Sequence, residues 1–264
     1  YNTSGQSNTA IGLNAMNDNA TGFYNTALGA GSSINNYSNA TAIGVGATAT
    51  ASNQVMLGST SVTSVKAAGS FTIYSDGRFK KNITENVPGL EFIKQLRPVT
   101  YNYDIHGLNS FIGVRNSSVE NEQENSEAAK QMEDAIINKE KKIFTGFIAQ
   151  EVEVAANKSG YDFGGLYKPQ NNKDPYGLSY ADFVVPLVKA VQELSQQNDE
   201  KDTKISDLQQ QINELKTLVQ SVAKENGMNA ANSLTLSGAS LEQNAHNPFT
   251  NSTSIGSTLP EKFI

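Results

Sequence analysis

The sequence predicts an elongated chain of several unlike regions rather than one globular fold. Residues 1–60 repeat a short phrase rich in Gly, Ala and Asn, residues 61–182 have a mixed composition, and residues 184–222 carry apolar side chains at heptad spacing. Repeats this short are typical of a β-solenoid, and sustained heptads are typical of a coiled coil. We therefore expect β-solenoid repeats, a central α+β domain and a C-terminal α-helical coiled coil, in that order.

The repeated phrase ends in a large apolar residue followed by glycine. The apolar positions are 17, 15 and 14 residues apart, at Ile11, Leu28, Ile43 and Leu57. We expect this side chain to point inward once per coil, while glycine allows the tight corner. So thin a core must stack or oligomerise to be stable. The alternative is an unstructured Gly/Ser/Asn linker, which gives no reason for the apolar positions to recur in step.

These phrases resemble the head repeats of trimeric autotransporter adhesins. The resemblance implies left-handed β-rolls formed by three chains, and hence a homotrimer. The Asn-, Ser- and Thr-rich surface over residues 1–60 would suit polar contacts to a host glycan or matrix ligand, without naming one.

Composition excludes several classes of protein. The formal charge of −6 argues against binding to a nucleic-acid backbone, and the lack of cysteine excludes disulfides and thiolate chemistry. No apolar run approaches the roughly 18 residues that span a bilayer. No metal-ligand spacing such as His-Glu-x-x-His occurs, so we expect no metal or cofactor. The sequence starts at Tyr1 inside a repeat, so we expect a fragment or processed form, and the lack of a signal peptide is weak evidence.

The central region predicts short elements around a polar insertion. We expect a connecting strand over 61–74, with its clearest part at 71–74 and its end at Ser75. Pro98 would end a helix over 91–96. A strand over 99–103 follows, and 145–149 returns to the core and leads into a helix from Gln150. Residues 115–142 carry charges of both signs, which indicates a solvated insertion that is partly helical or mobile.

Five heptads begin at Val184. Position a holds β-branched residues and position d mostly leucine: Val184, Val191, Ile205, Ile212 and Val219 at a, and Leu187, Leu194, Leu208, Leu215 and Val222 at d. Asn198 and Lys201 form one polar layer, which would fix the register. This pattern alone favours a parallel dimer, but the adhesin-like repeats imply a trimer, which we expect to prevail. Ser179 and Asp182 have the spacing of a capping box, and Pro186 predicts a kink or a later helix start.

One pair of residues could carry chemistry. A serine nucleophile needs a base, and the chain has only two histidines, His106 and His246. Lys80 lies five residues after Ser75, in Ser75-Asp76-Gly77-Arg78-Phe79-Lys80. Alone, this pattern favours a polar turn with a serine helix cap over a catalytic dyad.

Four blocks in order change that weighting. The first runs from Ser75 to Ile83, and the others are Leu96-Arg97-Pro98-Val99-Thr100-Tyr101, Gly146-Phe147-Ile148-Ala149-Gln150-Glu151-Val152 and the segment 180–191. Together they resemble the C-terminal intramolecular chaperone domain of endosialidases and phage tail spikes, over about residues 74–195. The insertion at 115–142 departs from that pattern. The self-cleaving members of this family form a serine peptidase family.

The resemblance implies a trimerisation chaperone that cuts itself from an attached fibre, once per chain. Ser75 would be the nucleophile, Lys80 its base and Tyr74–Ser75 the scissile bond, with Asp76 and Arg78 as candidate supports. The domain would span 75–183, followed by the coiled coil over 184–224. The alternative is a structural adhesin or tail-fibre stalk that trimerises without cleavage. A hydrolase acting on other molecules is disfavoured, because no second acid/base pair stands out.

The tail over 225–264 reads as a linker followed by a short motif. Leu241, Asn247-Pro248-Phe249 and Leu259-Pro260 resemble the start of a type IX secretion sorting domain, although His246 stands where that family usually has proline. The resemblance implies an extracellular or cell-surface bacterial protein. An unstructured tail, and a phage virion tail as the location, remain the alternatives.

Overall fold

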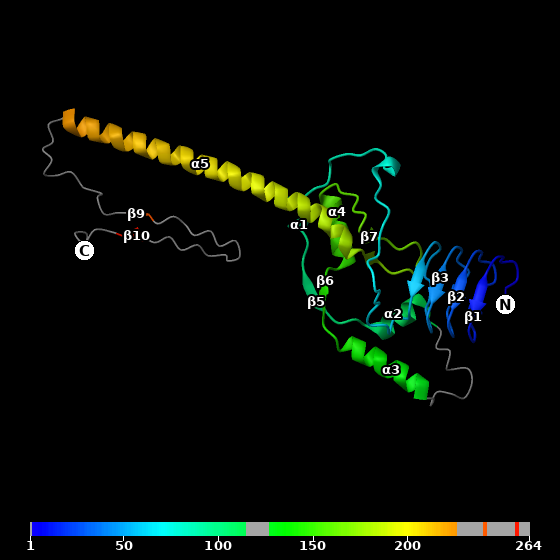
Figure 1. Cartoon of the computed structure of the whole chain (residues 1–264). Coiled ribbons are helices and arrows are strands. Elements are labelled where there is room, and N and C mark those ends of the chain that lie inside the picture. The colour runs from blue at the N-terminus through cyan, green and yellow to red at the C-terminus, as the bar shows by residue number, and fades with distance from the viewer. Residues whose placement is uncertain (1, 115–126, 226–239, 242–256, 259–264) are drawn as a thin grey trace. The chain divides into compact units, whose positions relative to one another are not determined.

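The computed structural model describes residues 2–114, 127–225, 240–241 and 257–258 (Figure 1). The chain divides into two compact units, Tyr1–Gln196 and Gln197–Ile264. The first unit holds the repeats and the central α/β region. The second holds most of the long C-terminal helix.

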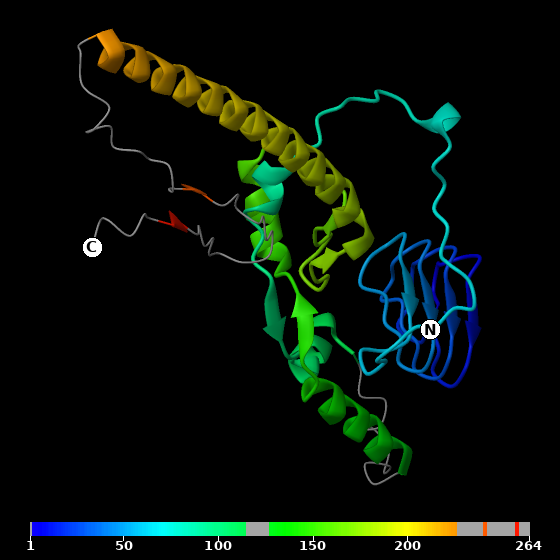
Figure 2. The ribbon, with the colours of Figure 1, turned by 60° about the vertical axis from the view of Figure 1, so that its left-hand side comes forward.

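Residues 2–60, here called the repeat region, form successive coils that stack on one another (Figure 2). Each coil gives one three-residue strand, and the strands pair in parallel in the order β1 (Thr9–Ile11), β2 (Thr26–Leu28), β3 (Thr41–Ile43) and β4 (Val55–Leu57). The register sets Ile11, Leu28, Ile43 and Leu57 side by side. The repeated phrase therefore marks the same place in every coil.

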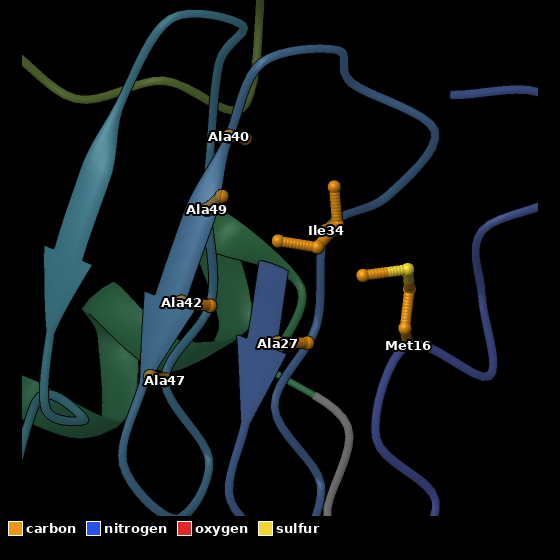
Figure 3. Packing of buried hydrophobic residues seen from close by; sticks show 7 residues of the cluster. All are labelled: Met16, Ala27, Ile34, Ala40, Ala42, Ala47 and Ala49. Carbon is orange, nitrogen blue, oxygen red and sulfur yellow. The ribbon is translucent and has the colours of Figure 1, made fainter. Parts of the chain in front are cut away.

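The direction of these apolar side chains is opposite to the sequence prediction. Ile11, Leu28, Ile43 and Leu57 are 39–60% exposed, whereas Ala27 and Ala42, one position earlier, are fully buried. Neighbouring residues in a strand face opposite sides, and the narrow coil has room only for alanine on its inner face. Figure 3 shows the interior side chains, which are Met16, Ala27, Ile34, Ala40, Ala42, Ala47 and Ala49. Ile34 and Met16 supply the bulk from the opposite wall.

Asparagine side chains join one coil to the next. Asn25 is buried; its side-chain N–H donates to Tyr37 O at 2.7 Å, and its Oδ1 accepts from Ala40 N at 2.9 Å. Asn8 repeats this pattern one coil earlier, toward Gly22 and Asn25. These bonds satisfy corner backbone groups that no strand pairs, which explains why the first two copies of the phrase begin with Asn.

The central region builds short elements along the chain. They are η1 (Gly77–Phe79), α1 (Leu90–Ile93), β5 (Val99–Tyr101), α2 (Ile105–Ile112), α3 (Glu127–Glu140), β6 (Phe144–Gly146), α4 (Ala149–Lys158), β7 (Leu166–Tyr167), β8 (Gly177–Leu178) and η2 (Tyr180–Phe183). β5 pairs antiparallel with β6, and β7 with β8. The predicted helix over 91–96, the strand over 99–103 and the helix from Gln150 are confirmed as α1, β5 and α4, with shifted ends.

An aromatic cluster forms the core of this region. Phe92 of α1 is fully buried and lies 5.2–6.4 Å, ring centre to ring centre, from Tyr161, Phe163 and Phe183. Val152, Ala155 and Ala156 of α4 close the cluster from the other side. Rings at these separations pack efficiently, so α1, α4 and η2 share one core.

The predicted insertion divides into two parts. Residues 115–126 lie outside the described chain, while 127–140 form α3. The helical part is confirmed, but α3 is not only a solvated excursion, because it packs against α2. His106 of α2 holds Glu140 and Glu133 of α3, at 2.8 and 3.0 Å.

The heptad segment forms one helix, α5 (Val184–Glu225). The helix begins at Val184, later than the capping box at Ser179, so the predicted later start is confirmed. Pro186 is the third residue of α5, a position that needs no backbone N–H because the first N–H groups of a helix have no partner within it. The capping box is wrong: Ser179 precedes η2 and makes no side-chain cap bond. All ten apolar a and d side chains are exposed in the single chain, at 45–65%. The first turns belong to the central core, where Glu193 Oε2 accepts from Leu90 N at 2.7 Å.

The sorting-like tail falls mostly outside the described residues. Only β9 (Ser240–Leu241) and β10 (Ser257–Thr258) are described there, and they pair antiparallel. None of the helices in the described part of the chain is long and apolar enough to cross a membrane.

Candidate functional site

Ser75 and Lys80 lie in an exposed segment between the repeat region and α1. Every residue from 62 to 86 is exposed, and Figure 1 shows this stretch as the cyan trace that leaves the coils and returns at α1. The predicted strand over 71–74, and with it the connecting strand over 61–74, is wrong for the single chain. A strand needs a neighbour for its backbone hydrogen bonds, and no described strand pairs with these residues.

A single 3-10 turn brings the two candidate residues together. Asp76 caps η1, with its carboxylate accepting from Arg78 N at 2.9 Å, and Lys80 N closes the turn on Gly77 O at 3.2 Å. Lys80 Nζ then lies 2.9 Å from Ser75 Oγ. A nucleophile and its base must be within hydrogen-bond reach, and this pair is. Both side chains are open to water.

The candidate supports Asp76 and Arg78 face each other instead of the pair. Arg78 Nη2 lies 2.6 Å from Asp76 Oδ2, and Arg78 Nε is bonded to both carboxylate oxygens. The Arg78 side chain therefore holds the pKa of Asp76 below its usual value, and Asp76 raises the pKa of Arg78. Both groups shape the turn, and their charges offset each other beside Lys80.

Large apolar side chains surround the site without cover. Phe71, Ile73, Phe79 and Ile83 are 75–81% exposed, and Tyr74 is fully exposed. Exposed apolar side chains this close together in sequence are typical of an interaction surface. Within the described residues, nothing removes water from Lys80.

The remaining candidates hold no competing site. No group of three or more His, Cys, Asp or Glu within the described ranges is placed to hold a metal ion. His106 pairs with glutamates on α3, far along the chain from Ser75, and His246 lies outside the described residues. Sequence reasoning missed one polar centre, the buried Asp174 in the loop between β7 and β8. A lone aspartate before proline gave no signal.

These observations define a class of protein: a fibre-like repeat joined through an exposed Ser–Lys turn to an α/β region that ends in a long heptad helix. The family model described as the chaperone of endosialidase, a peptidase family, matches residues 75–161. The match covers about a third of the chain, and this segment is similar to the intramolecular chaperone domain of that family.

The matched segment begins at Ser75 itself and ends at Tyr161, earlier than the expected end near 195. It contains the first three sequence blocks and leaves out the fourth. Neither the comparison with curated proteins nor that with solved structures found a match. The resemblances of the repeats and of the tail therefore remain predictions.

Proposed function

We propose that this chain is part of a trimeric surface or tail fibre whose chaperone domain assembles the attached repeats and then cuts the Tyr74–Ser75 bond. The observation that carries the proposal is the 2.9 Å approach of Lys80 Nζ to Ser75 Oγ, at the first residue of the chaperone match. The domains would be 75–183 for the chaperone and peptidase, 184–224 for the coiled coil and 1–60 for β-roll repeats.

The chemistry uses the chain's own preceding bond. Lys80 takes the hydroxyl proton as Ser75 Oγ attacks the Tyr74 carbonyl carbon, and the proton passes to the departing Ser75 nitrogen. The C–N bond breaks and an ester forms between Tyr74 and the Ser75 side chain. Water then hydrolyses the ester, leaving a carboxylate on Tyr74 and a free amine on Ser75. Because nucleophile and substrate are adjacent, no encounter is needed.

Assembly would supply what the single chain lacks. A lysine in water has a pKa of about 10.4 and is therefore protonated at neutral pH. It can act as a base only after loss of water favours its neutral amine. Packing of three chains over the exposed apolar residues near Tyr74 would remove that water. Cleavage would then follow correct assembly, and the finished fibre would be held by its unfolding barrier.

Two further apolar surfaces support the homotrimer. One is the ladder of exposed Ile11, Leu28, Ile43 and Leu57 along the stacked coils, and the other is the exposed a/d stripe of α5. Each repeats an apolar side chain at matched positions, which would let identical chains pack against one another along its length. We place such a fibre outside the cell or in a phage tail.

The test is N-terminal sequencing and intact-mass measurement of the expressed protein. A new terminus at Ser75 is expected, and Ser75→Ala or Lys80→Ala should abolish it. Lys80→Arg should also fail, because a guanidinium does not give up its proton. Lys81→Ala is the matched control, since this neighbouring exposed lysine makes no bond to Ser75 in the described chain; it should cleave normally. Asp76→Asn should retain most of the activity.

The second candidate function is a structural stalk that never cleaves. The full exposure of Ser75 and Lys80 favours it. A wild-type protein that is trimeric by light scattering and still intact after prolonged incubation would select this function. Continued scission at Tyr74–Ser75 in Ser75→Ala would refute the dyad.

A further inference from the structure

A second contact region joins the repeat region to the chaperone domain, far along the chain from the Ser75 turn. On the repeat side it uses the last coil and the residues just after it. On the other side it uses α2, α3 and the loop between β7 and β8. We call it the joint, and it comprises Thr50, Thr60 and Val62 facing Asn109, Lys139, Asn171 and Asp174.

The centre of the joint is a buried carboxylate. Asp174 is 1% exposed and accepts three hydrogen bonds. Tyr167 OH donates at 2.6 Å and Gln170 N at 2.9 Å, both from within the same hairpin, and Thr50 Oγ1 donates at 2.6 Å from the last coil. A buried carboxylate is costly unless its oxygens are bonded, so this hairpin is incomplete without a donor from the repeat region.

Three further facts support a role of this centre in the contact. Asn171 Nδ2 donates to Thr50 O at 2.7 Å, so Thr50 is held through both its backbone and its side chain. Burial first, and the Asp174 carboxylate next, raises the pKa of Tyr167 to about 12, which keeps its hydroxyl a donor at neutral pH. Thr50 itself is 3% exposed.

A second patch lies just beyond the last coil. Lys139 of α3 donates to Thr60 O at 2.6 Å and to Val62 O at 2.7 Å, and Thr60 Oγ1 donates to Asn109 Oδ1 of α2. The Lys139 ammonium thus binds two backbone carbonyl groups, so this contact does not depend on the side chains of Thr60 and Val62. The joint therefore ends at Val62, the first residue of the exposed segment.

The joint also covers the end of the stack. β4 is the last strand of the four-stranded sheet in the repeat region. The terminal unit of a solenoid needs a polar cap. The hairpin loop supplies polar contacts at Thr50, and α3 supplies them after β4. The loop between β7 and β8 therefore contacts the final coil directly.

We infer that the joint keeps the repeat region and the chaperone domain bound to each other after the chain is cut between them. The natural cut rests on the proposed self-cleavage, but the joint does not. All of its repeat-side residues precede Tyr74, and all of its chaperone-side residues follow Ser75. Cleavage then yields a two-piece complex rather than a released fibre.

The experiment cuts the chain without using Ser75. A recognition sequence for a site-specific protease replaces exposed residues 66–69 in the full chain carrying Ser75→Ala, and the cut protein is diluted and passed over a sizing column. Both pieces are expected to elute together. Separate elution of the two pieces, each still folded by circular dichroism, would overturn the inference.

Variants then assign the binding to the joint. Thr50→Val keeps the shape of the side chain and leaves the hairpin's own bonds to Asp174 in place, but removes the donor from the repeat side. Combined with Lys139→Ala it should weaken the complex roughly tenfold to a hundredfold or more. Thr72→Val, in the exposed segment, is the matched control and should change nothing. A double variant that binds as tightly as the parent would refute the assignment.

This design separates the two proposals. Failure of the wild-type chain to acquire a Ser75 terminus would count against self-cleavage and leave the added-protease result standing. Dissociation after the added protease would count against the joint and leave the Ser–Lys chemistry untouched.

Discussion

Gly29 stands where two coils of the repeat region approach each other closely. Its φ is +133°, and a Cβ built there would lie 2.5 Å from Gly44 O. Only glycine accepts that backbone conformation without strain, and no rotamer change relieves a clash with backbone. Such strain alone costs about 1–3 kcal/mol.

Gly29→Ala should therefore lower the free energy of unfolding of the repeat region by at least that amount, measured by urea denaturation followed by circular dichroism. Gly69→Ala is the control, because a Cβ there meets nothing within 4 Å. Equal midpoints for the two variants would contradict the packing of the coils.

At this scale the sequence predicted positions better than directions. The spacing of Ile11, Leu28 and Ile43 correctly marked one place per coil. The inward direction was wrong, because spacing does not reveal how wide a coil is. Width is set by which residues line the opposite wall, here Ile34 and Met16, and these follow no repeat. The buried Asp174 was missed because its partner Thr50 lies over a hundred residues away.

Among the elements, helix α3 is joined to α2 through the side chain of one histidine. His106 Nδ1 lies 2.8 Å from Glu140 and Nε2 lies 3.0 Å from Glu133, and Glu140 also accepts the backbone N–H of Ile105 and His106. Glu140 first and Glu133 next raise the pKa of His106, while the bonds to His106 lower the pKa of Glu140.

These pKa shifts determine how the stability of α3 changes with pH. The contribution of His106 is complete below about pH 6.5, its ordinary pKa, and is lost as the pH rises through the raised value. The contribution of Glu140 is complete above about pH 4.3 and is lost as the pH falls through its depressed value. Amide exchange of α3, corrected for intrinsic rates, should thus be slower at pH 6 than at pH 8.

His106→Gln is the control for this effect. It should give α3 the same corrected protection at both pH values, because glutamine does not titrate. Protection in the parent that is constant, or that grows toward pH 8, would contradict the role of His106.

Elements with local signals were predicted, and those that need partners were not. Proline at 98, alternation over 99–103 and heptads from Val184 each act within a few residues, and the helix or strand appears. The strand over 71–74 has the right composition but no neighbour in this chain. Helix α3 was expected only as part of a polar insertion, because its contacts with α2 come from the fold.

For the whole molecule, α5 is the helix on which the proposed trimer would depend. Leu208 is 57% exposed at position d, and an apolar side chain there gains by burial against identical chains. Leu208→Lys should reduce the mass found by light scattering from three chains to one, since burying three ammonium groups together is unfavourable.

The same sample tests whether cutting requires assembly. Leu208→Lys should stay intact at Tyr74–Ser75, while Gln210→Lys, on the outer face of the helix, should remain trimeric and cleave. A monomeric Leu208→Lys protein that cuts at the parental rate would show that desolvation by assembly is unnecessary.

The segment containing Ser75 is held at both ends. Lys139 binds the carbonyl of Val62 where the segment begins, and Glu193 binds the N–H of Leu90 where it finishes. A chain with two fixed ends has fewer conformations than the same chain with one end free. The proposed scission would convert this closed loop into two free tails and increase the conformational entropy of the segment. Rejoining Tyr74 to Ser75 would require both tails to meet again. Re-formation of the peptide bond would therefore be disfavoured even while the two pieces remain bound.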